Sequence, residues 1–416
     1  MEGLFSVIFM LFVAIPSLYA RVTPNAGSSN FNIVNYGAKG DGQTDDSQAF
    51  VKAWNDLCAA TQGAPTLLIP KGKSFMLQPV SFKGPCKTNN VNIELQGTLV
   101  APKSVVAWKW ANNNKGAWID FSGINGLVIR GGGTFDGQGA TWWAKYSDDS
   151  DRPSALRFHS CKNLALSATN HINSPRNHIS ISTCSDSSIS NIHVTAPEES
   201  PNTDGIDISG STNILIKDST IRTGDDCIAI NDGSSFINIT GITCGPGHGI
   251  SVGSLGRDRK LAKKHFWPLM FQVCANYAPI LFLSTFLPLM FSNSAPSTHP
   301  SLRLSQERFL SRLEPRKFET VEEVHVRNCI FQGTTNGARI KTWQAVKVSE
   351  VTFRNFTGNS ASEEAITLNC DPTVGCTGII LNKINIKYVS AGKRTRALCN
   401  NVRGSFSLCS PNVVCS

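Results

Sequence analysis

Three aspartates and a histidine recur at a fixed spacing in the middle of the chain. Asp204, Asp226 and His248 follow one another at steps of 22 residues, and Asp225 directly precedes Asp226. Carboxylates that are crowded together repel one another, so we expect at least one of them to keep a proton near neutral or mildly acidic pH. A protonated acid beside ionised bases is what hydrolysis of a glycosidic bond requires. We therefore predict that these four residues form a catalytic centre.

Two cationic side chains lie further along the chain. Arg339 and Lys341 are two positions apart in an alternating segment, so both should project from the same side of a strand. Positive charge beside the acids would suit a substrate made of carboxylated sugar units.

The 22-residue step belongs to a longer internal repeat that predicts how these residues are positioned. Short alternating segments, bounded by Gly, Asn, Ser or Asp, align Ile206, Ile228 and Ile250 in one column. Two or three short strands in each turn of roughly 22–30 residues are typical of a parallel β-helix, whose coils stack about 4.8 Å apart. Such stacking would place the acids on one face. A β-sandwich also has alternating strands, but it does not explain the fixed step. The aligned copies are 177–181, 203–208, 225–230, 247–252 and 335–340.

One segment, residues 261–317, interrupts the repeat. From His248 to Asn336 the step is 88 residues, and removing these 57 residues leaves 31, close to one coil. The segment has seven basic and two acidic residues, so it supplies +5 of the net charge of +9, and it contains Cys274, the odd one of 13 cysteines. Three interpretations stay open: a membrane helix, which its prolines disfavour, an evolved loop, and retained intron sequence or a gene-model artefact, which we favour.

The remaining features indicate an exported protein. Residues 1–20 contain an apolar run and predict a signal peptide, which leaves 21–416 as one domain. The many cysteines suit disulfides, and Asn238 and Asn355 lie in possible glycosylation tripeptides. The basic charge suits an anionic polysaccharide, whereas nothing resembles a nucleic-acid-binding module. We expect a secreted monomer without stable membrane insertion.

A metal site is the main chemical alternative. Clustered aspartates can hold Ca²⁺, and a calcium-binding parallel β-helix would suit a pectate lyase. The histidine and the Arg339–Lys341 pair fit hydrolysis better, so we predict no metal and no cofactor.

Taken together, the motifs resemble those of the glycoside hydrolase 28 polygalacturonases, most closely the plant ones. The opening segment 31–42 and the glycine-rich segment 132–139 are also similar to the family, and the resemblance covers residues 31–259 and 318–415. The motifs are Asn202-Thr203-Asp204, Gly224-Asp225-Asp226-Cys227, Gly247-His248-Gly249 and Arg339-Ile340-Lys341.

The resemblance implies an all-β, right-handed, single-stranded parallel β-helix that hydrolyses α-1,4-galacturonosyl linkages of pectin in the cell wall with inversion. Asp225 would be the general acid, Asp204 and Asp226 the bases, and His248 would tune the acid or share its proton. The substrate-binding residues would be Asn202, Arg339 and Lys341. A related glycosidase acting on rhamnogalacturonan is disfavoured by the cationic pair together with His248.

The resemblance also implies disulfides and one departure from the family. The implied pairs are Cys227–Cys244, Cys370–Cys376 and a pair among the terminal cysteines, and we consider Cys58–Cys86 plausible near the N-terminal cap. After Trp343 a segment of roughly 40–50 residues, carrying a substrate-binding tyrosine, is absent by comparison with the family. The rival hypothesis is therefore a catalytically impaired or non-catalytic pectin-binding β-helix.

Overall fold

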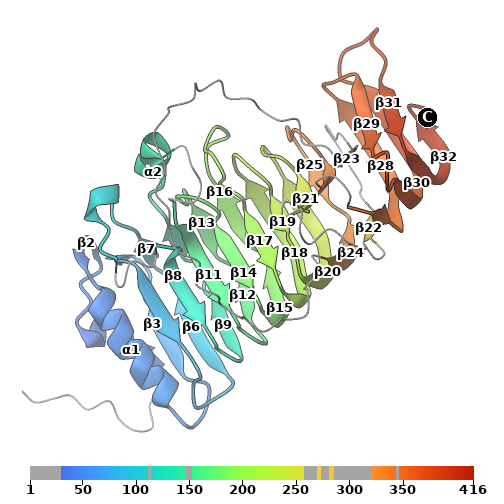
Figure 1. Cartoon of the computed structure of the whole chain (residues 1–416). Coiled ribbons are helices and arrows are strands. Elements are labelled where there is room, and N and C mark those ends of the chain that lie inside the picture. The colour runs from blue at the N-terminus through green and yellow to red at the C-terminus, as the bar shows by residue number, and fades with distance from the viewer. Residues whose placement is uncertain are drawn as a thin grey trace, which may run out of the picture.

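The computed structural model describes residues 30–110, 115–146, 152–256, 269–272, 281–284, 320–342 and 346–416. They form an elongated solenoid that runs from α1 at one end to β32 at the other (Figure 1). The predicted signal peptide, residues 1–20, and most of the segment 261–317 lie outside the described residues. Within the described ranges, no helix is long and apolar enough to cross a membrane.

One sheet forms the face that carries the predicted site. All of its strands are paired in parallel with their neighbours, as expected for stacked coils. In spatial order its strands are β5 (Val80–Lys83), β8 (Ala117–Ser122), β11 (Ser154–His159), β14 (Ile179–Ser182), β17 (Ile206–Ser209), β19 (Ile228–Ile230), β21 (Ile250–Leu255), β26 (Ala338–Thr342), β23 (Leu281–Ser284), β29 (Glu364–Asn369) and β31 (Arg396–Asn400).

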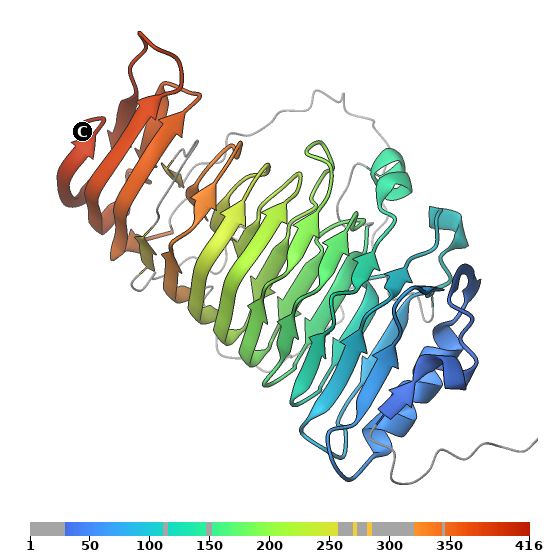
Figure 2. The ribbon, with the colours of Figure 1, turned by 180° about the vertical axis from the view of Figure 1, so that it is seen from behind.

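The second sheet closes the coils with two rows of parallel strands (Figure 2). The longer row is β1 (Asn30–Asn32), β3 (Thr66–Ile69), β6 (Val91–Leu95), β9 (Leu127–Arg130), β12 (Ala165–Ser167), β15 (Ser185–Ser190), β18 (Thr212–Arg222), β20 (Ser234–Cys244), β24 (Val321–Arg327), β22 (Leu269–Gln272), β28 (Val351–Ser360), β30 (Cys376–Tyr388) and β32 (Val402–Ser410), with β27 (Val348–Ser349) beside the start of β30. The other row is β2 (Asp41–Asp45), β4 (Ser74–Met76), β7 (Thr98–Val100), β10 (Thr134–Asp136), β13 (Asn170–Ile172) and β16 (His193–Thr195), continued by the second halves of β18 and β20 and by β25 (Ile330–Phe331).

The predicted columns are the registers of these sheets. Ile206 pairs with Ile228, Ile228 with Ile250, and Ile250 with Ala338. All four side chains are fully buried in the interior of the solenoid. Because alternate side chains of a strand point to opposite faces, the polar residues between them face outward. The parallel β-helix predicted from the sequence is therefore confirmed.

The two rows of the second sheet meet at a corner that needs a left-handed backbone. Asn191, Asp218, Gly241 and Asn328 occupy equivalent positions of successive coils, and all have φ between 49° and 68°. Asn, Asp and Gly tolerate this conformation better than other residues. These residues are the turn signals that bounded the strands in the sequence.

The N-terminal end of the solenoid is covered by helix α1 (Ser47–Ala59), which buries Phe50, Trp54 and Leu57 against the first coils. The Cys58–Cys86 disulfide links the end of this helix to the segment after β5. Among the described residues, the other helices are η1 (Ile33–Tyr36), η2 (Val105–Ala107) and α2 (Ala140–Lys145).

The disulfides agree with the expected pairs. Cys227–Cys244, Cys370–Cys376 and Cys58–Cys86 are formed, and the pair among the terminal cysteines is Cys399–Cys415. An even number of cysteines outside the inserted segment did not mean that all are paired. Among the described residues, Cys161, Cys184 and Cys329 are buried thiols and Cys409 is a half-buried one, while Cys274 lies outside them.

Two short pieces of the segment 261–317 belong to the sheets. β22 pairs with β24 on one side and with β28 on the other, and β23 lies in the same way between β26 and β29. Together they fill one coil position out of sequence order. That position follows β26, where the resemblance implied a missing coil; Trp343 itself lies outside the described residues.

Candidate active site

The predicted acids lie in equivalent turns of successive coils. Asp204, Asp226 and His248 each stand two residues before a strand of the first sheet, namely β17, β19 and β21. Backbone hydrogen bonds tie the turns together, with Gly205 N donating to Asp226 O at 2.9 Å and Cys227 N donating to Gly249 O at 2.8 Å. The sequence period therefore brings these residues together, as predicted.

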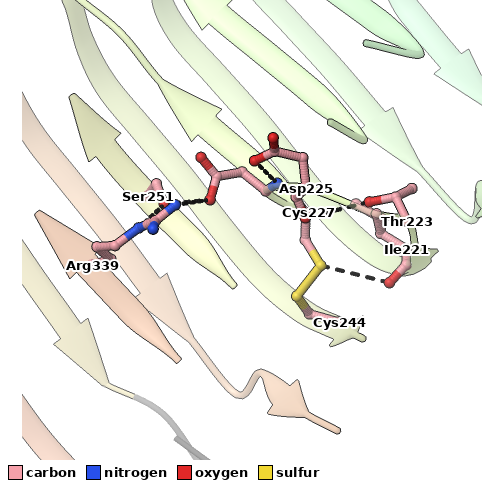
Figure 3. Close-up of a disulfide and its surroundings, with 8 residues drawn as sticks. Ile221, Thr223, Asp225, Cys227, Cys244, Ser251 and Arg339 are labelled. Atoms are coloured by element: carbon pink, nitrogen blue, oxygen red, sulfur yellow. Dashed lines mark hydrogen bonds and ion pairs between the residues drawn. A yellow bond between two sulfur atoms is a disulfide. The ribbon is translucent and has the colours of Figure 1, made fainter. Parts of the chain in front are cut away.

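Glycine is required where these turns approach one another. A Cβ atom on Gly205 would lie 2.5 Å from the carbonyl oxygen of Cys227, and one on Gly249 would lie 2.2 Å from that of Asn336. Gly249 also has a φ of +86°, which disfavours any side chain. The Cys227–Cys244 disulfide adds a covalent anchor directly after Asp226 (Figure 3).

Asp226 is the centre of a buried ion-pair network. Its side chain is 2% exposed, and one oxygen accepts hydrogen bonds from Arg339 Nη2 and Ser251 Oγ, both at 2.6 Å. Its other oxygen accepts a hydrogen bond from Lys341 Nζ at 2.9 Å. Arg339 Nε also donates to Ser251 Oγ at 3.0 Å. The two cations that the sequence predicted as substrate contacts therefore hold a carboxylate as well; Figure 3 shows Arg339 beside Ser251.

Asp225 forms a second pair beside this network. His248 Nδ1 lies 2.9 Å from Asp225 Oδ1, and Asn202 Nδ2 lies 3.5 Å from Asp225 Oδ2. The side chain of His248 is 37% exposed and that of Asp225 is 19% exposed. Burial alone would raise the pKa of Asp225, but the hydrogen bond and charge of His248 hold the pKa below its ordinary value.

Asp204 is a buried carboxyl group whose surroundings favour its protonated form. Burial, together with the negative charges of Asp207 and Asp225, raises the pKa of Asp204 well above its ordinary value. A raised pKa is what the crowding of carboxylates in the sequence predicted. The resemblance implies that Asp225 is the general acid, which stays a prediction; the raised pKa values belong to Asp204 and Asp207.

The sequence reasoning did not identify Asp207, Ser251 or Arg152 as parts of the site. Asp207 and Ser251 lie in one outward-facing column with Arg339. Burial raises the pKa of Asp207 to about 7, although the nearby charge of Arg176 opposes the rise. The sequence could have indicated Asp207 and Ser251 as outward-facing residues of the site, because both alternate with buried residues in the aligned copies. Nothing in the sequence marked Arg152, which comes from a loop outside the repeat.

The acidic cluster also brings together residue types that can ligate a metal ion. Oxygen or nitrogen atoms of Asp225, Asp226 and His248 lie within 4.8 Å of one another. However, Arg339 and Lys341 already contact both oxygens of Asp226. Two cationic side chains occupy the place of the positive charge that a Ca²⁺ ion would bring, and Ca²⁺ prefers six to eight oxygen ligands. These residues do not fit a calcium site.

The outward face of the same sheet leads from the acids to an open cleft. Arg157 of β11, Ser180 of β14 and Asp207 of β17 are in register, so a continuous row of polar residues connects the two places. The cleft has a volume of about 590 Å³ and includes Lys83, Lys109, Asp120 and Arg157 in its lining. Arg157 is paired with Asp120 at 2.7 Å, which leaves the two exposed lysines as its available cations.

Comparisons with known proteins agree with this geometry. A family model described as glycosyl hydrolases family 28 matches residues 58–265 and 344–411. A probable polygalacturonase of Arabidopsis thaliana is 39% identical over 433 residues, covering 93% of this chain and 81% of that protein. An exopolygalacturonase of Zea mays is 35% identical over 402 residues, covering 95% of this chain and 92% of that protein.

Solved structures show the same fold at low identity. The endo-xylogalacturonan hydrolase of Aspergillus tubingensis has a TM-score of 0.67 and 21% identity, covering 91% of this chain and 97% of its own. The polygalacturonase of Erwinia carotovora has a TM-score of 0.54 and 21% identity, covering 90% of this chain and 94% of its own. By its family match and its curated relatives, the chain belongs to glycosyl hydrolases family 28 and groups with the plant polygalacturonases of that family.

Proposed function

We propose that this glycosidase hydrolyses α-1,4-galacturonosyl linkages of polygalacturonan, the substrate that the names of its relatives indicate. The observation that carries the proposal is the composition of one face. A buried carboxylate, Asp226, is held by two cations beside the Asp225–His248 pair, and Asp204 stands one coil away. This arrangement supplies a proton donor, a base and positive charge within one site.

Asp225 is the proposed general acid, with His248 as its proton partner. In the absence of substrate, the lowered pKa of Asp225 favours its ionised form. A galacturonate chain brings additional negative charge, which favours moving the proton from His248 Nδ1 onto Asp225. From there the proton reaches the glycosidic oxygen as the bond between this oxygen and the anomeric carbon breaks.

Asp226 and Asp204 are the proposed bases for the attacking water. The water adds its oxygen to the anomeric carbon and passes its proton to one of these carboxylates. Asp226 accepts hydrogen bonds on both oxygens, from Ser251, Arg339 and Lys341, which hold its carboxyl group in place. Asp204 must first lose the proton that its raised pKa retains.

Inversion is the proposed stereochemical course. One carboxylate oxygen of Asp225 lies within 4.8 Å of one carboxylate oxygen of Asp226. Inverting enzymes commonly hold their two carboxyl groups farther apart, at roughly 6.5–9.5 Å. The short separation alone would suit a retaining enzyme, in which the second carboxylate attacks the sugar. The resemblance to the family, however, implies inversion, and Asp226 Oδ2, which accepts a hydrogen bond from Lys341 Nζ, has a further lone pair for a water molecule. We therefore assign Asp226 to water activation.

Substrate binding is assigned to Arg339, Lys341 and Asn202. The side chains of Arg339 and Lys341 are 17% and 22% exposed, so both stay partly accessible to a substrate while they contact Asp226. Further carboxylated units would follow the sheet toward Lys83 and Lys109. The net charge of +9 supports binding of an anionic polymer.

Secretion to the cell wall is part of the proposal. The predicted signal peptide at 1–20 and the four disulfides suit an oxidising compartment outside the cytosol.

The experiment is release of reducing ends from polygalacturonate by residues 21–416, with Asp225→Asn and the exposed-site control Asp218→Asn beside it. We expect the Asp225→Asn variant to lose at least about 100-fold in rate, and the control to match the unmodified chain. A proton NMR spectrum of the first product should show inversion. Binding of polygalacturonate without hydrolysis by the unmodified chain would instead support the rival, non-catalytic hypothesis.

A further inference from the structure

Arg152 is a buried cationic side chain next to the site that the proposed chemistry does not use. It stands two residues before β11 and is 1% exposed. A guanidinium placed so deeply is expensive unless its donors are satisfied. What those donors contact therefore indicates why the side chain is there.

The guanidinium joins two successive turns on the face of the site. Nη1 donates to the carbonyl oxygen of Pro175 at 3.1 Å and to that of Pro201 at 2.5 Å. Nη2 donates to Oδ1 of Asn202 at 2.6 Å. Pro175 lies in the turn before β14, and Pro201 and Asn202 lie in the turn before β17.

This contact fixes the orientation of the Asn202 amide. A guanidinium has only donor groups, so the atom of Asn202 that faces it must be the carbonyl oxygen. The amide nitrogen must then point the other way, and it lies 3.5 Å from Oδ2 of Asp225. The assignment of oxygen and nitrogen therefore follows from the chemistry of Arg152 rather than from the shape of the amide alone.

We propose that Arg152 is a positioning residue that holds the amide nitrogen of Asn202 toward Asp225. The inference rests on the proposed function, because Asp225 is there the general acid. Arg152 does not touch the reacting atoms, and its effect on Asp225 is assigned to its contact with Asn202.

An arginine suits this role for geometric reasons. Its planar group presents donors in several fixed directions, so one side chain can bind a carbonyl from each turn and the amide oxygen together. Asn202 adopts a left-handed backbone with a φ of 53°, a conformation that asparagine tolerates but that still needs support from its surroundings. Lysine has one nitrogen atom and cannot reproduce this arrangement.

Loss of the contact between Arg152 and Asn202 should raise the pKa of Asp225. With Arg152 removed, the Asn202 amide is free to turn and present its oxygen, which stabilises the protonated rather than the ionised form of Asp225. Activity that needs a protonated Asp225 should then persist to higher pH. The other charged groups that act on or contact Asp225 are His248, Asp226, Asp204, Asp207 and Lys341, and none of them is altered.

The experiment compares Arg152→Gln, Asn202→Ala and the double variant, with Arg130→Gln as a distant exposed control. We expect Arg152→Gln to lower kcat by roughly 10–100-fold with less effect on KM. The alkaline limb of its kcat/KM profile should move up by about half a pH unit. Adding Arg152→Gln to Asn202→Ala should change the limb little further, because coupled residues are not additive. Thermal unfolding of each variant checks that it folds.

Three results would overturn the proposal. One is that Arg152→Gln loses activity while the alkaline limb of its kcat/KM profile stays in place. Another is that Arg152→Gln shifts the alkaline limb equally in the unmodified chain and in the Asn202→Ala variant. The third is full activity of Arg152→Lys with an unchanged limb. If the unmodified chain releases no reducing ends, the proposed function fails by itself. A crystal structure of Arg152→Gln then decides about Arg152: an unmoved, well-ordered Asn202 side chain refutes its positioning role.

Discussion

At the residue scale, the site combines carboxyl groups with opposite tendencies. Asp225 is pushed toward its ionised form by His248, whereas burial and neighbouring charges push Asp204 and Asp207 toward their protonated forms. Groups with pKa values driven apart are what acid–base chemistry requires. The arrangement also carries a cost, because a carboxyl group with a raised pKa weakens the folded state once the pH is high enough to ionise it.

Asp207→Asn should stabilise the protein at neutral pH. The folded state keeps the Asp207 proton up to about pH 7, whereas the unfolded chain releases it near 3.8. Between these values the folded state binds more protons, so the free energy of unfolding falls as the pH rises. The shift corresponds to at most about 4 kcal/mol.

Thermal unfolding between pH 4 and pH 8 measures this effect. The melting temperature of Asp207→Asn should exceed that of the unmodified chain at pH 7, and the difference should vanish toward pH 4. Asp218→Asn, at an exposed corner, should show no such dependence. A lower melting temperature of Asp207→Asn at pH 7 would mean that pairing with Arg176 outweighs the cost of burial.

At the element scale, short turns between strands position the chemistry. Each turn is held by backbone hydrogen bonds to the next coil and by glycines that permit close approach. The Cys227–Cys244 disulfide connects the start of β19 with the end of β20, directly behind Asp226. The turn that carries Asp226 is therefore held by a disulfide as well as by hydrogen bonds to the neighbouring coils.

Removing the Cys227–Cys244 disulfide should reduce both stability and activity. The double alanine variant should lose roughly 2–4 kcal/mol of unfolding free energy, and kcat should fall because the turn carrying Asp226 loses its anchor. Removal of Cys399–Cys415 is a matched control, since its sequence separation is 16 against 17 and it lies in the C-terminal coils. Urea unfolding and reducing-end assays measure the two effects. An equal loss of kcat in both variants would contradict a local role.

At the scale of the whole molecule, the solenoid is continuous only because β22 and β23 fill one coil position. Each of them pairs on both sides, so they join the coil of β24 and β26 to the C-terminal coils. Without them, two rows of backbone donors and acceptors would lose their partners, or the C-terminal coils would have to move by about 4.8 Å to pair directly.

Deletion of residues 261–317 should therefore lower the melting temperature or the yield of folded protein. A smaller deletion, 290–312, keeps both strands and serves as the comparison that isolates their contribution. The two deletions are compared by circular dichroism during heating and by size-exclusion chromatography. A larger deletion that melts at the same temperature as the full chain would show that the two strands are dispensable, as expected of translated intron sequence.

The N-terminal cleft predicts a dependence on substrate length. Lys83→Ala combined with Lys109→Ala should raise KM for long polygalacturonate by roughly 2–10-fold, since each exposed ion pair contributes about 0.2–1 kcal/mol. KM for short oligogalacturonides, and kcat for both substrates, should not change because the cleft lies several coils from the acids. An equal rise for short substrates would place the lysines' effect at the catalytic centre.

The sequence alone determined the architecture and most of the acidic cluster. Each coil contacts only its neighbours, so a local repeat fixes the register, and Asp204, Asp226 and His248 could be placed on one face by counting. The disulfide Cys227–Cys244 followed from resemblance. The family also followed from resemblance, because the motifs occur together in the family's order along the chain.

Only the tertiary structure decided how the charges are distributed. The pKa of Asp204 depends on burial and on other carboxylates that sequence spacing does not quantify. Lys341, which contacts Asp226, is 115 residues away along the chain, and Arg152 reaches Asn202 across 50 residues. Pairing of β22 and β23 beyond β24 is likewise invisible in a linear pattern, because it breaks the rule that successive coils are sequence neighbours. Periodicity fixes which backbones stack, whereas protonation and non-sequential pairing depend on the three-dimensional environment.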